Sequence, residues 1–68
     1  MKVFMYEATI INLSEVKYID TFLANELTTS IRFHMKGESD KIAFLADIPN
    51  AKVPEILEEC YKIMKEED

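Results

Sequence analysis

The chain has 68 residues, a net charge of −5 and an apolar fraction of 49%. This length allows a single domain over residues 1–68 with a modest core. One cysteine and one histidine exclude an internal disulfide and a zinc site rich in Cys and His, so association with a second chain remains as the way to stabilise so small a core. No apolar run approaches the roughly 20 residues of a membrane span, and the amino terminus lacks a secretory pattern. With a lone thiol, we therefore expect a cytoplasmic protein that has no membrane partner.

Residues 1–13 are rich in β-branched and aromatic side chains, which predicts a strand. Both faces of this strand would be largely apolar, so it would need cover on both sides. The first face carries Phe4, Tyr6, Ala8 and Ile10, and the second carries Val3, Met5, Thr9, Ile11 and Leu13.

Residues 12–27 fit an amphipathic helix. Asn12 can cap its first turn, and Glu15 stands three residues later, as in a capping box. Apolar side chains then recur at helical spacing. They are Val16, Ile19, Leu23 and Leu27. A second strand through residues 16–19 is the competing interpretation and fits this pattern less well.

Residues 29–36 show strict alternation, which predicts a half-buried strand. Its apolar face holds Ile31, Phe33 and Met35, and its polar face holds Arg32, His34 and Lys36. Residues 37–40 combine a glycine with small polar residues, as turns do, and residues 41–48 form the next strand of a hairpin. In that strand Ile42, Phe44, Ala46 and Ile48 would share the face towards the helices, and Ala43, Leu45 and Asp47 the face away from them.

The last segment predicts a helix. Pro49 and Asn50 end the preceding strand, and Pro54 suits the first turn of a helix because its missing N–H has no partner there anyway. An apolar stripe follows at helical spacing. It comprises Val53, Ile56, Leu57, Cys60, Ile63 and Met64. Glu58 and Lys62 form a favourable i, i+4 pair.

The predicted order is β-α-β-β-α. It corresponds to an α+β fold with a three-stranded antiparallel sheet and two helices on one face, ferredoxin-like but lacking the last strand. The first strand would lie at a sheet edge with an apolar second face. Such a surface predicts a homodimer through that edge or through the open sheet face. The predicted dimer residues are Val3, Met5, Thr9, Ile11 and Leu45.

Charge points to two candidate partner-binding surfaces. Residues 55–68 hold six acids and two lysines, a net of −4, so the last helix is either a solvated face or an acidic docking surface. The polar face of the strand over residues 29–36 is either a solvated face or a site for an acidic partner or a small anion. The candidate partner-binding residues are Glu55, Glu58, Glu59, Lys62, Arg32, His34 and Lys36.

The residues indicate no catalytic, cofactor or metal site. Cys60 lies on the apolar stripe of a helix and His34 on the polar face of a strand, so the pair should not meet. Carboxylates on an exposed helix make poor acid–base catalysts and only weak metal ligands. Gly37 is the chain's one glycine, which excludes a glycine-rich phosphate loop. The acidity and the lack of interleaved aromatic residues argue against nucleic acid as a partner.

The sequence therefore predicts a small, non-catalytic intracellular interaction or regulatory module, a homodimer that docks on a larger protein. Two alternatives stay open at this point. One is a ligand-binding regulatory domain that uses the open sheet face. The other is an acidic inhibitor protein of the phage or plasmid type that presents the last helix.

Overall fold

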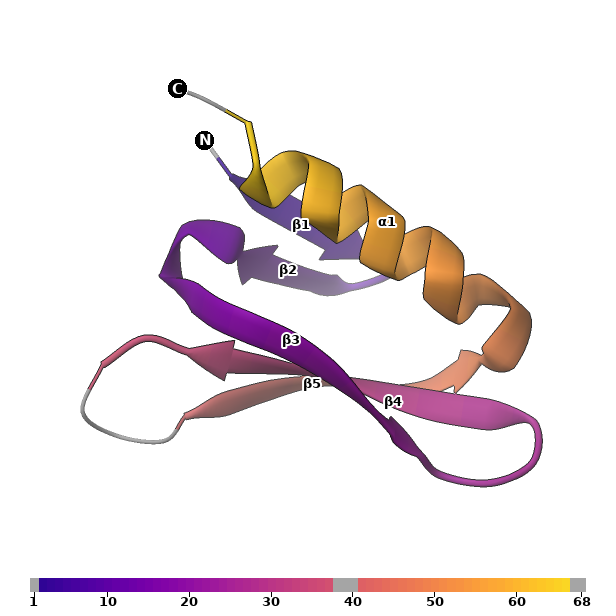
Figure 1. Cartoon of the computed structure of the whole chain (residues 1–68). Coiled ribbons are helices and arrows are strands. Elements are labelled where there is room, and N and C mark those ends of the chain that lie inside the picture. The colour runs from indigo at the N-terminus through magenta and orange to yellow at the C-terminus, as the bar shows by residue number, and fades with distance from the viewer. Residues whose placement is uncertain (1, 38–40, 67–68) are drawn as a thin grey trace.

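The computed structural model describes residues 2–37 and 41–66. Over these residues it contains five strands, two short 3-10 turns and one α-helix (Figure 1). The strands are β1 (Val3–Tyr6), β2 (Thr9–Asn12), β3 (Val16–Leu23), β4 (Thr28–Met35) and β5 (Ile42–Pro49). The turns are η1 (Leu13–Glu15) and η2 (Asn50–Lys52), and the helix is α1 (Val53–Met64).

The strands form two antiparallel sheets. β1 pairs with β2 alone, and β3, β4 and β5 form a meander in that order. Figure 1 shows the β1–β2 hairpin and α1 on the same side of the three-stranded sheet. The core lies between these layers. Its buried apolar side chains are Phe4, Ile11, Leu13, Val16, Ile31, Phe33, Leu45, Ile48, Ile56 and Cys60.

The strand predicted over residues 1–13 is two strands, and the structure corrects the prediction. The chain reverses at Glu7 and Ala8, so that Tyr6 pairs with Thr9. Glu7 adopts a positive φ of 51°. Tight hairpin turns of this kind are usually marked by Gly, Asn or Asp at that position, and this turn has none of them.

The helix predicted over residues 12–27 is also wrong. The cap itself is confirmed, because Oδ1 of Asn12 accepts a hydrogen bond from the backbone N–H of Ser14 at 3.1 Å. The element that Asn12 caps is the short 3-10 turn η1, which ends at Glu15, and the chain then continues as β3.

A β-bulge explains the misleading spacing. The register of β3 against β4 shifts between Val16 and Tyr18. One extra residue at Lys17 therefore puts Val16 and Ile19 on the same face of a strand, although they stand three apart. The residues that completed the helical pattern, Leu23 and Leu27, are 67% and 77% exposed.

The ferredoxin-like β-α-β-β-α fold is consequently contradicted. The described chain has five strands in two sheets and one α-helix, in place of three strands and two helices. The second layer over the main sheet is a hairpin plus a helix. Val16–Leu23 is rich in Val, Ile, Thr and aromatic residues, which favour a pleated strand over a helix once a sheet is available to pair with.

The hairpin over residues 29–48 and the last helix are confirmed. Gly37 has the positive φ of 118° expected for the turn, and residues 38–40 of that turn lie outside the described residues. The faces of β5 differ from the prediction, because Ala43 and Leu45 pair with core residues of β4. A second bulge then sets two residues against one, with Asp47 at φ 57°, and returns Ile48 to the core.

Candidate functional site

The face of the β3–β4–β5 sheet that points away from α1 is covered by no described element. We call it the open face and define it by seven side chains. They are Tyr18, Asp20 and Phe22 of β3, Arg32 and His34 of β4, and Ile42 and Phe44 of β5. Along each strand these residues alternate with residues of the opposite face. Across the strands Tyr18 pairs with His34 and Asp20 with Arg32, whereas Phe22 pairs with Ser30.

An ion-paired cluster occupies the centre of the open face. Arg32 donates from Nε and from a terminal nitrogen to the two carboxylate oxygens of Asp20, at 2.8 and 2.7 Å. This bidentate pair holds the pKa of Asp20 below its ordinary value and raises the pKa of Arg32. His34 Nε2 lies 3.0 Å from Asp20 Oδ1. Because an ionised carboxylate can only accept, Nε2 must be the nitrogen that carries the proton.

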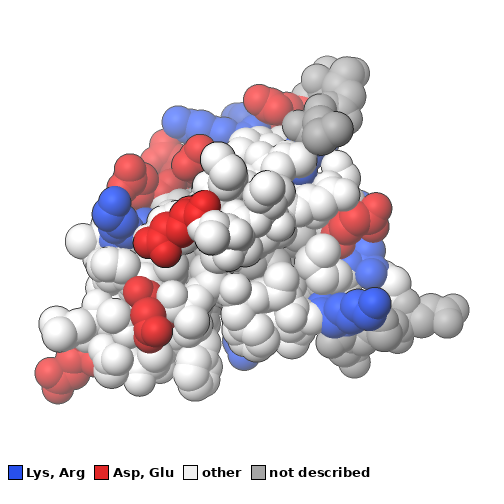
Figure 2. All heavy atoms as spheres, turned by 180° about the vertical axis from the view of Figure 1, so that it is seen from behind, with Lys and Arg blue, Asp and Glu red and all other residues white. Residues whose placement is uncertain are grey.

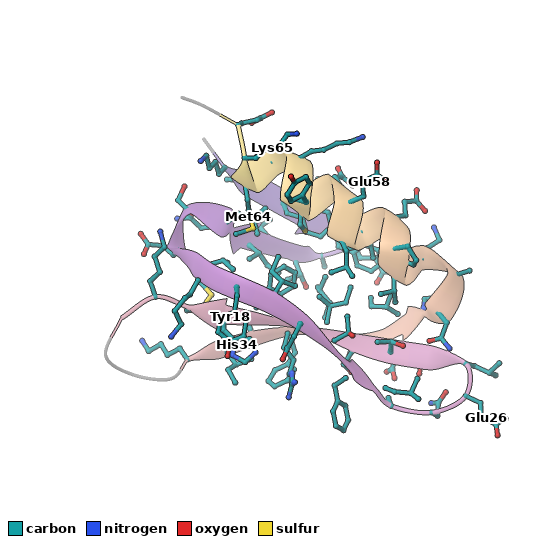
Figure 3. The ribbon with its side chains drawn as sticks, in the orientation of Figure 1. Tyr18, Glu26, His34, Glu58, Met64 and Lys65 are labelled. Carbon is teal, nitrogen blue, oxygen red and sulfur yellow. The ribbon has the colours of Figure 1, made fainter. Side chains whose placement is uncertain are left out.

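Aromatic rings flank this cluster. The rings of Tyr18 and His34 stack at a centroid distance of 4.1 Å and an interplanar angle of 14° (Figure 3). The guanidinium carbon of Arg32 lies 5.7 Å from the ring centre of Phe22. Tyr18, Phe22 and Phe44 are nevertheless 50%, 57% and 58% exposed. The face therefore presents three large rings, of which Tyr18 and Phe22 lie against a neighbouring side chain.

A shallow hollow adjoins one end of the open face. It has a volume of about 360 Å³. Its lining consists of Lys17, Tyr18, His34, Met35, Lys41 and Ile42. Two lysines beside a stacked Tyr–His pair would suit an anion that carries a flat ring.

The turn at the other end of the face is rigidly held. Asn25 Oδ1 accepts from the backbone N–H groups of Leu27 and Thr28, at 2.8 and 2.9 Å. Asn50 binds the turn from η2, since its Nδ2 donates to the Glu26 carbonyl at 2.9 Å. The exposed Leu27 is therefore displayed on an ordered turn (the region of Glu26 in Figure 3).

The structure does not bring the two sets of predicted partner-binding residues together. Arg32 and His34 lie on the open face, and Lys36 is exposed just beyond the end of β4. The predicted residues of the last helix are exposed on α1, across the sheet from the open face. They are Glu55, Glu58, Glu59 and Lys62, and Lys62 Nζ pairs with Glu58 Oε1 at 3.3 Å. On the side of the molecule that faces away from the viewer in Figure 1, acidic and basic residues are interspersed with uncharged surface (Figure 2).

The predicted dimer residues do not form one surface. Ile11 and Leu45 are core residues with 4% of their area exposed. Val3 is half-buried, whereas Met5 and Thr9 are exposed on the β1–β2 hairpin. The residues that sequence reasoning missed are Tyr18, Asp20, Phe22 and Phe44. The signal that could have found three of them was the β-branched and aromatic content of residues 16–23.

The described residues contain no nucleophile–base pair around the cysteine. Cys60 is a fully buried residue of α1, and burial, followed by the charge of Glu59, raises the pKa of its thiol to about 11. His34 lies on the opposite side of the sheet. Among the described residues no group of three His, Cys, Asp or Glu side chains could hold a metal ion. In the same part of the chain, no helix has the length and apolar character needed to cross a membrane.

No protein-family model matches the chain. Comparison with curated proteins and with solved structures likewise finds no significant match.

Proposed function

We propose that this chain is a small non-catalytic protein-interaction module that docks on a larger protein through its open face. One observation carries the proposal: three exposed aromatic rings surround an ion pair that is satisfied within the chain, on a sheet face that none of the described elements covers. Tyrosine and arginine are among the residues that contribute most to protein interfaces. The lone, buried thiol supports a cytoplasmic location.

Several side chains of the open face are held in place before any partner binds, which supports a role in docking. Binding costs free energy when it immobilises mobile side chains, and the cost falls where those side chains are already held. On the open face Arg32 is fixed by Asp20, and Tyr18 is stacked on His34. A partner that covers these groups would order little that is still free.

A small anion that occupies the hollow at Lys17 and Lys41 is the second candidate. The observation that favours it is the hollow itself, with two cations and a stacked aromatic pair in its lining. This ligand-binding function and the first proposal use neighbouring parts of one face, so a single experiment can separate them.

The experiment is affinity capture from a lysate of the source cells, with the tagged chain as bait. Phe22→Ser/Phe44→Ser removes two rings of the open face, and Tyr61→Ser removes an equally exposed ring from α1 as the matched control. We expect a stoichiometric protein partner with the unsubstituted chain and with the control, and its loss with the double variant.

Two results would contradict this proposal. A partner that the double variant retains would place the docking surface elsewhere. Capture of no protein, together with a native mass that shows a bound anion lost in Lys41→Gln, would favour the ligand-binding candidate instead.

A further inference from the structure

The open face carries no excess of acidic residues on a strongly acidic molecule. Its one carboxylate, Asp20, is paired with Arg32, whereas the chain carries a net charge of −5. The acidic residues that give the chain its net charge therefore lie outside this face. Two copies of the chain repel each other through that net charge, and the repulsion is smallest where the surfaces that meet carry no excess of acids.

The ion pair at the centre needs nothing from a partner. Both oxygens of Asp20 already accept hydrogen bonds from Arg32, and one also contacts His34. A buried charge is costly when it is left unpaired, and this pair would stay paired when water is removed. A strongly charged partner would find no free counter-charge in this cluster, whereas an uncharged aromatic surface would pack against it.

We propose that the cover of the open face is a second copy of this chain, packed open face to open face about a two-fold axis. This inference rests on the proposed function, because it names an occupant for the same surface. In such a contact the rings of Tyr18, Phe22 and Phe44 from each copy interdigitate between sheets about 10 Å apart.

The area of the open face indicates which class of interface the dimer belongs to. Three strands of eight residues span roughly 26 Å along the strands and roughly 14 Å across, given the usual strand rise and spacing. That flat area of roughly 370 Å² lies below the roughly 800 Å² per partner of a standard stable interface, even before the protruding rings are added. An interface of this size belongs to the weak, transient class. A tighter-binding larger protein can then replace the second copy.

Other surfaces are poorer candidates for self-association. The acidic residues Glu55, Glu58 and Glu59 of α1 would face one another across a helix-to-helix contact. The edge of β5 carries a bulge at Asp47 and a proline at its end, and both hinder the addition of another strand.

The test is sedimentation equilibrium between about 5 and about 500 µM, a range that brackets a weak dimer. The unsubstituted chain should rise from the mass of one chain towards that of two. Phe22→Ser/Phe44→Ser should stay at one chain throughout. Ile10→Ser removes an exposed apolar residue of the β1–β2 hairpin and should dimerise like the parent. Thermal melts by circular dichroism verify that each variant folds.

A second measurement uses the unsubstituted chain. In a mixture of labelled and unlabelled protein, isotope-filtered NMR should show contacts between chains at the rings of Tyr18 and Phe44. A single-chain mass at every concentration, a dimer that survives in the double variant, or contacts between chains elsewhere would each overturn this inference. The proposed function fails by a different result, the retention of a captured partner by the double variant, so the two failures are distinguishable.

Discussion

Asp20 organises the open face at the scale of single residues. It accepts hydrogen bonds from Arg32 and contacts His34, which in turn stacks on Tyr18. Four residues from two strands are therefore linked through one carboxylate. Its loss would free the guanidinium and the imidazole to move, so that the rings beside them would no longer be held in place.

Asp20→Asn should lower stability near neutral pH, and the loss should depend on pH. The folded-state pKa of Asp20 lies below its ordinary 3.8. The pair therefore stabilises the fold above the unfolded-state pKa, and this contribution is lost as the pH falls through the folded-state pKa. Urea unfolding should show a gap between the variant and the parent that closes between about pH 5 and about pH 2.

Glu26→Gln is the control for this prediction, because it removes one carboxylate from an exposed turn position. A gap between Asp20→Asn and the parent that is independent of pH would show that the variant acts through lost shape or packing. No gap at neutral pH would show that the ion pair does not stabilise the fold.

At the scale of elements, Asn50 fastens the β3–β4 turn to η2. Its Oδ1 accepts from the nearly buried Thr29 hydroxyl at 2.6 Å, its Nδ2 donates to the Glu26 carbonyl, and its backbone N–H donates to Leu27. Asn50→Ala should therefore destabilise the protein by about 1–3 kcal/mol, because it leaves a buried hydroxyl without a partner.

Urea unfolding measures the loss of stability. The variant Asn50→Asp separates the contribution of the side-chain acceptor from that of the side-chain donor. The aspartate keeps an acceptor for Thr29 but loses the donor to Glu26, so its loss of stability should be the smaller of the two. Equal stability of Asn50→Ala and the parent would mean that the side chain does not hold the turn.

The elements that were predicted correctly differ from those that were not in how regular their backbone is. Strict alternation in Thr28–Met35 and Pro54 in the first turn of α1 were sufficient signals for a strand and a helix. The bulge at Lys17 gave a strand the spacing of a helix, and the turn at Glu7 lacks any turn-favouring residue. Both failures lie in local backbone irregularities, which leave little trace in the pattern of apolar residues.

The candidate site was predicted only in part for the same reason. Arg32 and His34 were placed correctly on a polar strand face away from the core. Their partner Asp20 fell within the helix predicted over residues 12–27, so the ion pair and the Tyr18–His34 stack could not be foreseen. Phe44 was assigned to the face that the structure gives to Leu45.

At the scale of the whole molecule, the two sides of the main sheet differ in the side chains that they present. One side of the main sheet is covered by the hairpin and α1, which carry many of the acidic side chains on their outer surface. The other side carries the paired Asp20 and Arg32 and the exposed rings of Tyr18, Phe22 and Phe44. Lys2 Nζ donates to the Met64 carbonyl at 3.0 Å, so the amino-terminal strand and the end of α1 close the same layer. The open face is the side of the main sheet that no described element covers, and it is the surface for which binding is proposed.

The account depends most on β3 being a strand beside β4, because only then do Tyr18, Asp20 and Phe22 share a face with Arg32 and His34. An NMR nuclear Overhauser spectrum of the unsubstituted chain tests this directly. We expect a contact between the rings of Tyr18 and His34 and cross-strand contacts between β3 and β4. A run of contacts between residues three apart over 12–27 would instead show a helix, and it would remove the open face and the functions proposed for it.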